Sequence, residues 1–275
     1  MTEKLQATSA RKSGLPILYR PGALYTAERE ADRQQDQLRP AKASESTAAR
    51  IVADIVDRGL GVGDRLPPET DMLLAYGVSR ESLREALRIL EVQGLIAIKR
   101  GPGGGPFVTA LNASYLARTE TLYFNLAGAT YDEVFETWEI LEPPLSAKVA
   151  SIPDREVKRS AFAPFLEYDA PAHAHDEVFA SLNNFHAVIA ELSGNRVLTL
   201  VTQAINHIVV DHVLSAEDPV TENVGLGASH DEIAHAIIAG RSTRAATLMR
   251  QHIHEVTENF RNRHPGRMES LVEWR

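Results

Sequence analysis

The sequence predicts a mainly α-helical protein with one small β-hairpin, divided into two domains. Three observations support this fold class. The chain of 275 residues is long enough to form two hydrophobic cores. Apolar residues recur at helical spacing through most of the chain after residue 46. The runs LIAIKR (95–100) and PFVTA (106–110) are typical of paired strands, and they flank the glycine-rich stretch GPGGG.

The composition excludes several classes of protein. The chain has no cysteine, so it lacks a disulfide framework, a thiolate metal site and a cysteine nucleophile. No apolar run approaches the roughly 20 residues of a membrane-spanning helix, and the N-terminus lacks the apolar core of a secretory signal. We therefore expect a cytoplasmic protein without a membrane partner. A net charge of −8 argues against nucleic-acid binding by the whole surface, although a local basic patch is compatible with it.

The first elements lie between the N-terminus and residue 59. Residues 1–43 mix charged, small and glutamine residues without sustained apolar periodicity, which indicates a disordered arm. Ser46 or Thr47 is then placed to cap a first helix that ends at Gly59. The segment GVGDRLPPE follows as an extended connector, because a residue that precedes proline is disfavoured in helical geometry.

Two short helices follow in quick succession. The segment DMLLAYG predicts a second helix that ends at Gly77, with core candidates Leu73, Leu74 and Tyr76. Ser79 is placed to cap a third helix. The third helix presents an apolar stripe to the core, formed by Leu83, Ala86, Leu87 and Leu90.

This order of helices, followed by a hairpin, is that of a winged helix-turn-helix, whose third helix enters the major groove of DNA. We place this domain at residues 44–110. Arg80, Arg84 and Arg88 recur every four residues, so they share one side of the third helix. Guanidinium groups at such positions suit guanine edges and phosphates. The alternative is an ordinary solvated helix, in which the arginines pair with Glu81, Glu85 and Glu91.

The motifs RLPPE, VSRESLREAL, GLI and GPGGG occur in this order between about residues 46 and 110. This run resembles the DNA-binding domain of the GntR superfamily of bacterial transcription regulators. One position departs from the family pattern, since Thr70 stands where a basic residue usually follows the glutamate. The resemblance implies that DNA is contacted by Arg65, Ser79, Arg80, Ser82, Arg84, Arg100 and Gly101.

Residues 113–265 are dominated by long amphipathic segments, which predict an all-α helical bundle. The segments EVFETWEILEPPLSAKVAS, NNFHAVIAELSGN and HDEIAHAIIAG resemble the FCD effector domain of the FadR branch of the same superfamily. The resemblance implies a domain that binds a small-molecule effector and forms a homodimer.

In FCD domains that bind metal, three histidines converge in the bundle, and the corresponding positions here are His186, His230 and His252. Neutral imidazoles suit zinc or nickel, and three protein ligands leave a position open for an effector carboxylate. The family's aspartate position is Leu182 in this chain. A divalent metal is therefore one expectation, and the alternative is a cavity whose histidines bind an anionic ligand directly.

The effector candidates are Trp138, Asn183 and His207. Many FCD domains carry an arginine four residues before the glutamate of the L-E-P motif, and this chain has Trp138 before Glu142. Exchange of a carboxylate clamp for a flat apolar surface favours an effector that is less anionic or more aromatic than a simple hydroxy acid. Trp138 could equally fill the core of the bundle.

These features predict a transcription regulator, most often a repressor in this family, that binds a palindromic operator as a homodimer and responds to a small organic acid or related metabolite. A metal hydrolase is disfavoured, because the chain has no HExxH motif and no carboxylate at a spacing that identifies a general base. A structural DNA-binding or metal-storage protein is the third alternative. A purely structural DNA-binding protein would leave the helical domain without a role. A metal-storage protein would leave the third helix, with its arginines, without one.

Overall fold

The computed structural model describes residues 42–101, 103–166, 175–213 and 226–274, without the side chains of 175–183, 213 and 226–228. The described residues form two compact units that divide between Tyr115 and Leu116. The mainly α-helical fold with one hairpin is confirmed. Most of the predicted N-terminal arm, residues 1–41, lies outside the described residues.

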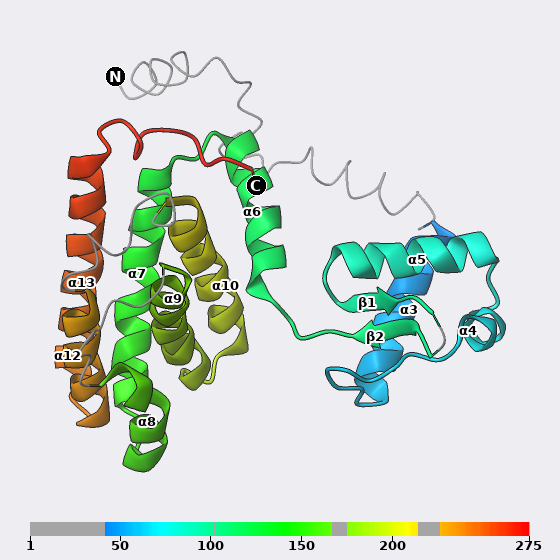
Figure 1. Ribbon diagram of the computed structural model, residues 1–275, viewed down its shortest axis with the longest axis horizontal. Helices are drawn as coiled ribbons and strands as arrows, with labels where there is room; N and C mark the ends of the chain where they lie inside the picture. Colours follow the sequence, from blue (N-terminus) through cyan, green and yellow to red (C-terminus); the bar gives the residue numbers. More distant parts are fainter. Residues whose placement is uncertain (1–41, 102, 167–174, 214–225, 275) are drawn as a thin grey trace, which may run out of the picture. The chain divides into compact units, whose positions relative to one another are not determined.

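The first unit is built from three short helices and a two-stranded antiparallel sheet (Figure 1). In the sheet, Ile96 pairs with Val108 and Lys99 pairs with Gly105. Residues 63–66 add a short third ribbon against the second strand, because Leu66 N donates to Pro106 O at 2.9 Å. The elements are α3 (Ala43–Asp57), α4 (Glu69–Tyr76), α5 (Arg80–Val92), β1 (Ile96–Lys99) and β2 (Gly105–Val108).

The sequence correctly predicted which face of α5, the third helix of this unit, packs against the core, since all four residues of its apolar stripe are buried. Two other predictions were wrong. Helix α3 begins at Ala43, so Ser46 and Thr47 lie inside it and do not cap it. In α4 the predicted Leu73 and Tyr76 pack against the core beside the buried Met72, whereas the predicted Leu74 is 84 % exposed. The eight-residue helix presents one narrow face to the core, and Leu74 lies on the opposite side of it.

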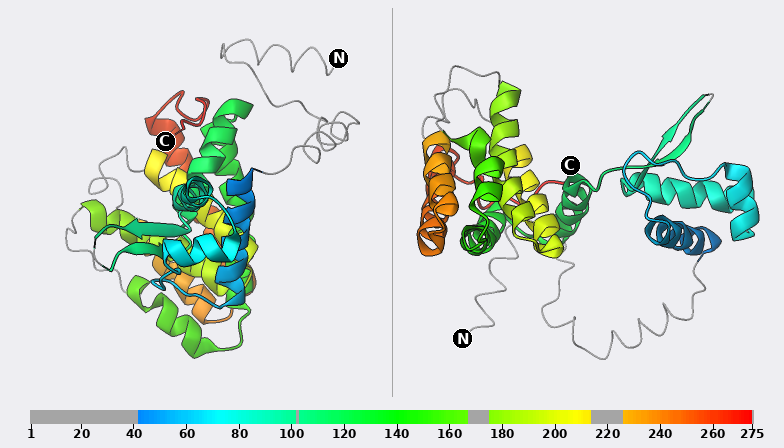
Figure 2. Two further views of the ribbon diagram at one scale, coloured as in Figure 1. Left: turned by 90° about the vertical axis from the view of Figure 1, so that its right-hand side faces the viewer. Right: turned by 90° about the horizontal axis from the view of Figure 1, so that it is seen from below.

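The second unit is all-helical apart from an isolated bridge between Thr130 and Leu271. Helix α7 lies at its centre and packs against α13 on one side and α9 and α10 on the other, as Figures 1 and 2 show. The elements are α6 (Ala113–Ala127), α7 (Tyr131–Ala150), α8 (Arg155–Phe162), η2 (Ala163–Phe165), α9 (His175–Leu192), α10 (Arg196–Ile208), the π-helical turn η3 (Val209–Val213), α12 (Leu226–Ile238) and α13 (Ser242–Arg263).

The chain after α13 returns across the ends of α6 and α7. Val272 N donates to Ala129 O at 2.9 Å, and Asn125 Nδ2 donates to Val272 O at 2.8 Å. Met268 and Val272 are buried there. The helical unit therefore includes a segment beyond residue 265, where the sequence analysis ended it. This segment has no helical periodicity and could be placed only by its contacts.

Candidate DNA-binding surface and candidate metal centre

The recognition helix α5 begins at a well-formed cap. Ser79 has extended backbone geometry, and its Oγ accepts a hydrogen bond from Ser82 N at 3.1 Å. The two hydroxyls also lie 3.0 Å apart. Because a capped helix start fixes the direction of the first turn, the side chains that follow are presented from a rigid position.

Arg80, Arg84 and Arg88 are all exposed on α5. Among the described residues, Arg84 forms an ion pair with Glu69 at 2.9 Å, and none of the three arginines pairs with Glu81, Glu85 or Glu91. The contact with Glu69 uses Nε, and a guanidinium has five N–H donors, so donors remain for a base or phosphate. The described residues therefore do not show the alternative, in which the arginines pair with glutamates of the same helix.

An open hollow runs between the start of α3 and the exposed side of α5. Its lining mixes four cations with three carboxylates, namely Lys42, Arg80, Arg84, Arg88, Glu81, Glu85 and Glu91. The surface is therefore locally basic but not uniformly so. Mixed charge of this kind favours contact through individual arginines over a general attraction to phosphate.

The hairpin carries the other predicted DNA contacts. The guanidinium of Arg65 donates to Gly104 O, so Arg65 ties the connector to the loop at the tip of the wing. Arg100 and Gly101 are exposed at the tip. A Cβ on Gly104 would lie 2.3 Å from Lys99 O, so the tight return of the chain here requires glycine. The wing is thus a compact loop that presents Arg100.

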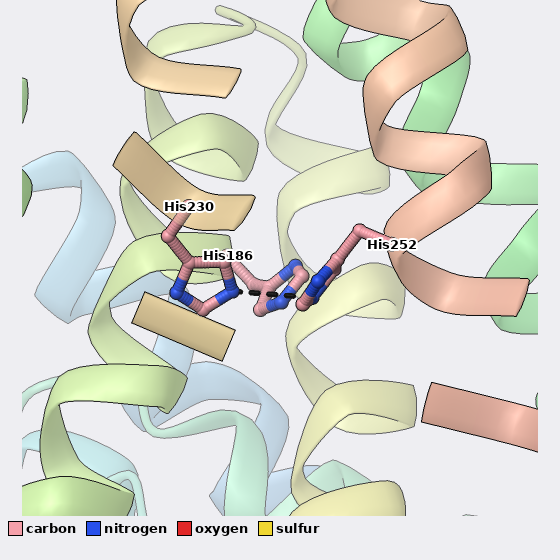
Figure 3. A group of neighbouring side chains, drawn as sticks. All are labelled: His186, His230 and His252. Atoms are coloured by element: carbon pink, nitrogen blue, oxygen red, sulfur yellow. Dashed lines mark hydrogen bonds between the residues drawn. The ribbon is translucent and has the colours of Figure 1, made fainter. Parts of the chain in front are cut away.

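The three predicted histidines converge in the helical unit (Figure 3). His186 comes from α9, His230 from α12 and His252 from α13, and each is at most 4 % exposed. One ring nitrogen from each lies within 4.8 Å of the others. His230 Nε2 and His252 Nε2 are 3.1 Å apart, which places both of these nitrogens at the centre of the cluster.

Two imidazoles of the cluster, those of His230 and His252, are held in the neutral form. Burial lowers the pKa of His230 well below its ordinary value, and the neighbouring His252 and His186 lower it further. Burial and His186 lower the pKa of His252 to about 3. Neutral imidazole is the form that binds a metal ion, because its unprotonated nitrogen offers a lone pair. The donor set therefore fits a divalent cation such as zinc or nickel.

Neighbouring side chains also contact the outward-facing parts of two of these histidine rings. Ser229 Oγ lies 2.8 Å from His252 Nδ1, which leaves His252 Nε2 facing inward. Phe185 stacks on the ring of His230 with centroids 4.0 Å apart. These contacts restrict the rotation of two of the three rings, as is usual for metal ligands.

Glu142, which was not among the predicted site residues, also lies beside the cluster. It is completely buried on α7, and its Oε1 lies 3.3 Å from His186 Nδ1. The pair is close enough for an ionic contact but is not aligned as a hydrogen bond, and both carboxylate oxygens lack a hydrogen-bond partner among the described residues. A glutamate in helical register with the apolar Trp138, Leu145 and Val149 was the available signal.

The effector candidates have different outcomes. Trp138 is 2 % exposed and its ring centroid lies 5.2 Å from that of His186, so it lies beside the cluster. Its Nε1 is buried without a hydrogen-bond partner among the described residues. His207 contacts Asp211 at 3.4 Å and its side chain is 32 % exposed, so the structure does not bring it into the cluster. The side chains of Asn183 and Leu182 lie outside the description.

A winged helix-turn-helix with exposed arginines, joined in one chain to a helical unit with an interior histidine cluster, defines a DNA-binding regulator with a ligand-binding domain. The profile described as bacterial regulatory proteins, gntR family, matches residues 43–105, and the FCD domain profile matches residues 133–255. The chain belongs to the GntR family and carries an FCD domain. It is a transcription regulator and not an enzyme.

Similar proteins are regulators as well. The chain is 27 % identical over 229 residues to the "Putative L-lactate dehydrogenase operon regulatory protein" of Escherichia coli K12, covering 78 % of this chain and 84 % of that one. It is 25 % identical over 190 residues to the HTH-type transcriptional repressor NanR of Escherichia coli K12 strain DH10B, covering 66 % and 68 %. A solved GntR structure from Streptococcus agalactiae has the same fold, with a TM-score of 0.56 at 21 % identity, over 78 % of this chain and 99 % of that one.

No helix in the described part of the chain is long and apolar enough to cross a membrane.

Proposed function

We propose that the protein is a cytoplasmic repressor that binds a palindromic operator as a homodimer and is controlled by a small organic acid bound next to a divalent metal. The proposal assigns residues 44–110 to DNA binding and 113–265 to effector binding and dimerisation. It rests on one observation above all: the three arginines of α5 are exposed while the three histidines of the helical unit converge in its interior.

The DNA side of the proposal rests on the recognition helix. Two such helices related by a two-fold axis read the two halves of a palindrome, which is why a homodimer accompanies this mode of binding. Arg80 and Arg84 are the proposed base or phosphate contacts from α5, with Ser79 and Ser82 at the helix start. Arg100 and Gly101 act from the wing, and Arg65 supports it. The relative NanR is named a transcriptional repressor, and this supports repression over activation as the direction of regulation.

The proposed metal ligands are His186, His230 and His252. When bound, a divalent cation supplies positive charge that can hold the carboxylate of an effector. The chain's own side chains then determine which acid fits. Trp138 offers a flat apolar surface and a buried N–H without a partner among the described residues, which suits an acid with an aromatic or apolar body and a hydrogen-bond acceptor.

A ligand of this kind controls DNA binding only if it binds one arrangement of the dimer better than another. The strength of regulation is then the ratio of those two affinities. An effector that binds both arrangements equally leaves the operator affinity unchanged.

The effector assignment can be tested by fluorescence of Trp138 in a Trp274→Phe variant, which removes the signal of the half-exposed second tryptophan. We expect aromatic acids to change the emission of the metal-loaded protein, to raise its melting temperature and to release its operator. Acids that raise the melting temperature without changing the emission would remove Trp138 from the effector site.

A further inference from the structure

We propose that Glu142 is the carboxylate that positions His186 for metal binding and balances the charge of the bound cation. The inference rests on the proposed metal function and extends it to a residue outside the ligand set. Glu142 comes from α7, a different helix from those that supply the three histidines.

The surroundings of Glu142 are unfavourable for a carboxylate. Glu142 is completely buried, and neither of its carboxylate oxygens has a hydrogen-bond partner among the described residues. A buried carboxylate without a compensating charge is strongly unfavourable. Its ion-pair contact among the described residues is with His186 Nδ1, 3.3 Å from Oε1, so a compensating positive charge is expected on the side of the histidine cluster. A divalent cation held by the same cluster would supply it.

The orientation of the histidine rings also favours this role for Glu142. His230 and His252 meet through their Nε2 atoms, and His252 has Ser229 at its outward Nδ1. His186 has Glu142 Oε1 3.3 Å from Nδ1, close enough for a hydrogen bond once the two groups align, and such a bond would leave Nε2 for the interior. A carboxylate that accepts the Nδ1 proton of a histidine fixes the tautomer and makes the other nitrogen a better ligand.

The geometry favours a positioning role over direct ligation. The group of side chains whose ligand atoms lie within 4.8 Å of one another consists of the three histidines and does not include Glu142. Oε1 and His186 Nδ1 are already 3.3 Å apart, so rotation of two side chains in contact is sufficient to align a hydrogen bond.

The test is cobalt binding by the full-length protein, measured by competition with a chelator and by the visible spectrum. We compare the wild type with Glu142→Gln, with His252→Ala and with Glu136→Gln, which makes the same chemical change at an exposed position of the same helix. For Glu142→Gln we expect affinity reduced by about 10- to 100-fold, with one cobalt per chain and the wild-type spectrum retained. Glu136→Gln should match the wild type.

The metal-free proteins provide a readout that a purely structural role would not give. Because neither carboxylate oxygen has a hydrogen-bond partner to lose among the described residues, metal-free Glu142→Gln should melt at or above the temperature of the wild type, while its metal affinity falls. A lower melting temperature together with wild-type affinity would overturn the proposal.

Other outcomes are equally decisive. A changed cobalt spectrum in Glu142→Gln would make Glu142 a direct ligand and overturn the positioning role. If Glu142→Gln does not fold, ¹⁵N NMR of the zinc-loaded wild type provides the test, because the proposal requires the His186 proton on Nδ1 and is overturned by a proton on Nε2. A wild type that binds neither zinc nor cobalt would overturn the metal function itself, whereas binding that is lost only in His252→Ala would overturn the role of Glu142 alone.

Discussion

The two units of the molecule place their basic side chains in opposite environments. Arg80, Arg84 and Arg88 lie exposed on the surface of α5, where the core of the unit does not depend on them. The three histidines of the helical unit are each at most 4 % exposed, and burial keeps His230 and His252 neutral. The first set suits a large anionic partner that approaches from outside, and the second suits a small cation enclosed by the fold.

This contrast has a consequence for mutation. Loss of a surface arginine should change binding without changing stability, because the surrounding water takes the place of the lost contacts. Loss of a buried histidine should change both, because it removes a ligand and leaves a cavity in a packed interior.

The largest expected effect is loss of the metal in His252→Ala. We expect its affinity for zinc to fall by more than about 100-fold, since one of three protein ligands is removed. Chelator competition measures this directly. His235→Ala is the control, because His235 lies on α12, the helix that supplies His230, but is exposed and contacts Asp231. An equal loss in the two variants would contradict the interior site.

Replacement of Arg84 by alanine should weaken operator binding by about 5- to 150-fold while leaving helicity intact. Fluorescence anisotropy with labelled operator measures the affinity, and circular dichroism measures the fold. Arg244→Ala, which removes a partly exposed arginine of the helical unit, should retain wild-type affinity. Loss of helicity in Arg84→Ala would show that this residue supports the core of α5.

Removal of the metal from the wild type should lower the melting temperature of the helical unit by several degrees. A ligand that binds only the folded state stabilises that state by mass action. Differential scanning calorimetry with and without a chelator measures the shift. The transition of the DNA-binding unit should not move, and a parallel shift of both transitions would contradict an effect confined to the histidine cluster.

The smallest effect concerns Glu120 on α6, a carboxylate with one buried oxygen that has no hydrogen-bond partner among the described residues. Burial raises its pKa from 4.5 to about 7. Stability from this group is therefore fully present below pH 4.5 and is lost as the pH rises through 7. Glu120→Gln should melt a few degrees above the wild type at pH 8 and show no advantage at pH 4. An advantage at both values would show that ionisation is not the cause.

The sequence predicted the DNA-binding unit well because its signals are local. The cap at Ser79, the stop at Gly77 and the apolar stripe of α5 each depend on neighbours within a few residues. The start of α3 was misplaced for the same reason, because several polar residues in a row offered alternative caps. The exposed Leu74 was misassigned because a short helix gives too few turns to define its buried face.

In the helical unit the sequence alone was less informative. The three histidines were found through the resemblance, and periodicity could not have selected them among ten histidines. The amphipathic segments that predicted the helical bundle did not include α6 or α8. The contact of Glu142 with His186 joins residues on different helices, so no spacing in the sequence encodes it. Tertiary packing alone brings these groups together.

The most direct test of the account is the affinity of the full-length, metal-loaded protein for a palindrome selected from genomic fragments, measured with and without an effector. We predict that the double variant Arg80→Ala, Arg84→Ala binds no palindrome, and that His252→Ala binds it but no longer responds to the effector. If the double variant retains wild-type affinity, or if His252→Ala responds as the wild type does, then the exposed arginines do not bind the operator or the buried histidines do not control it, and the account is contradicted.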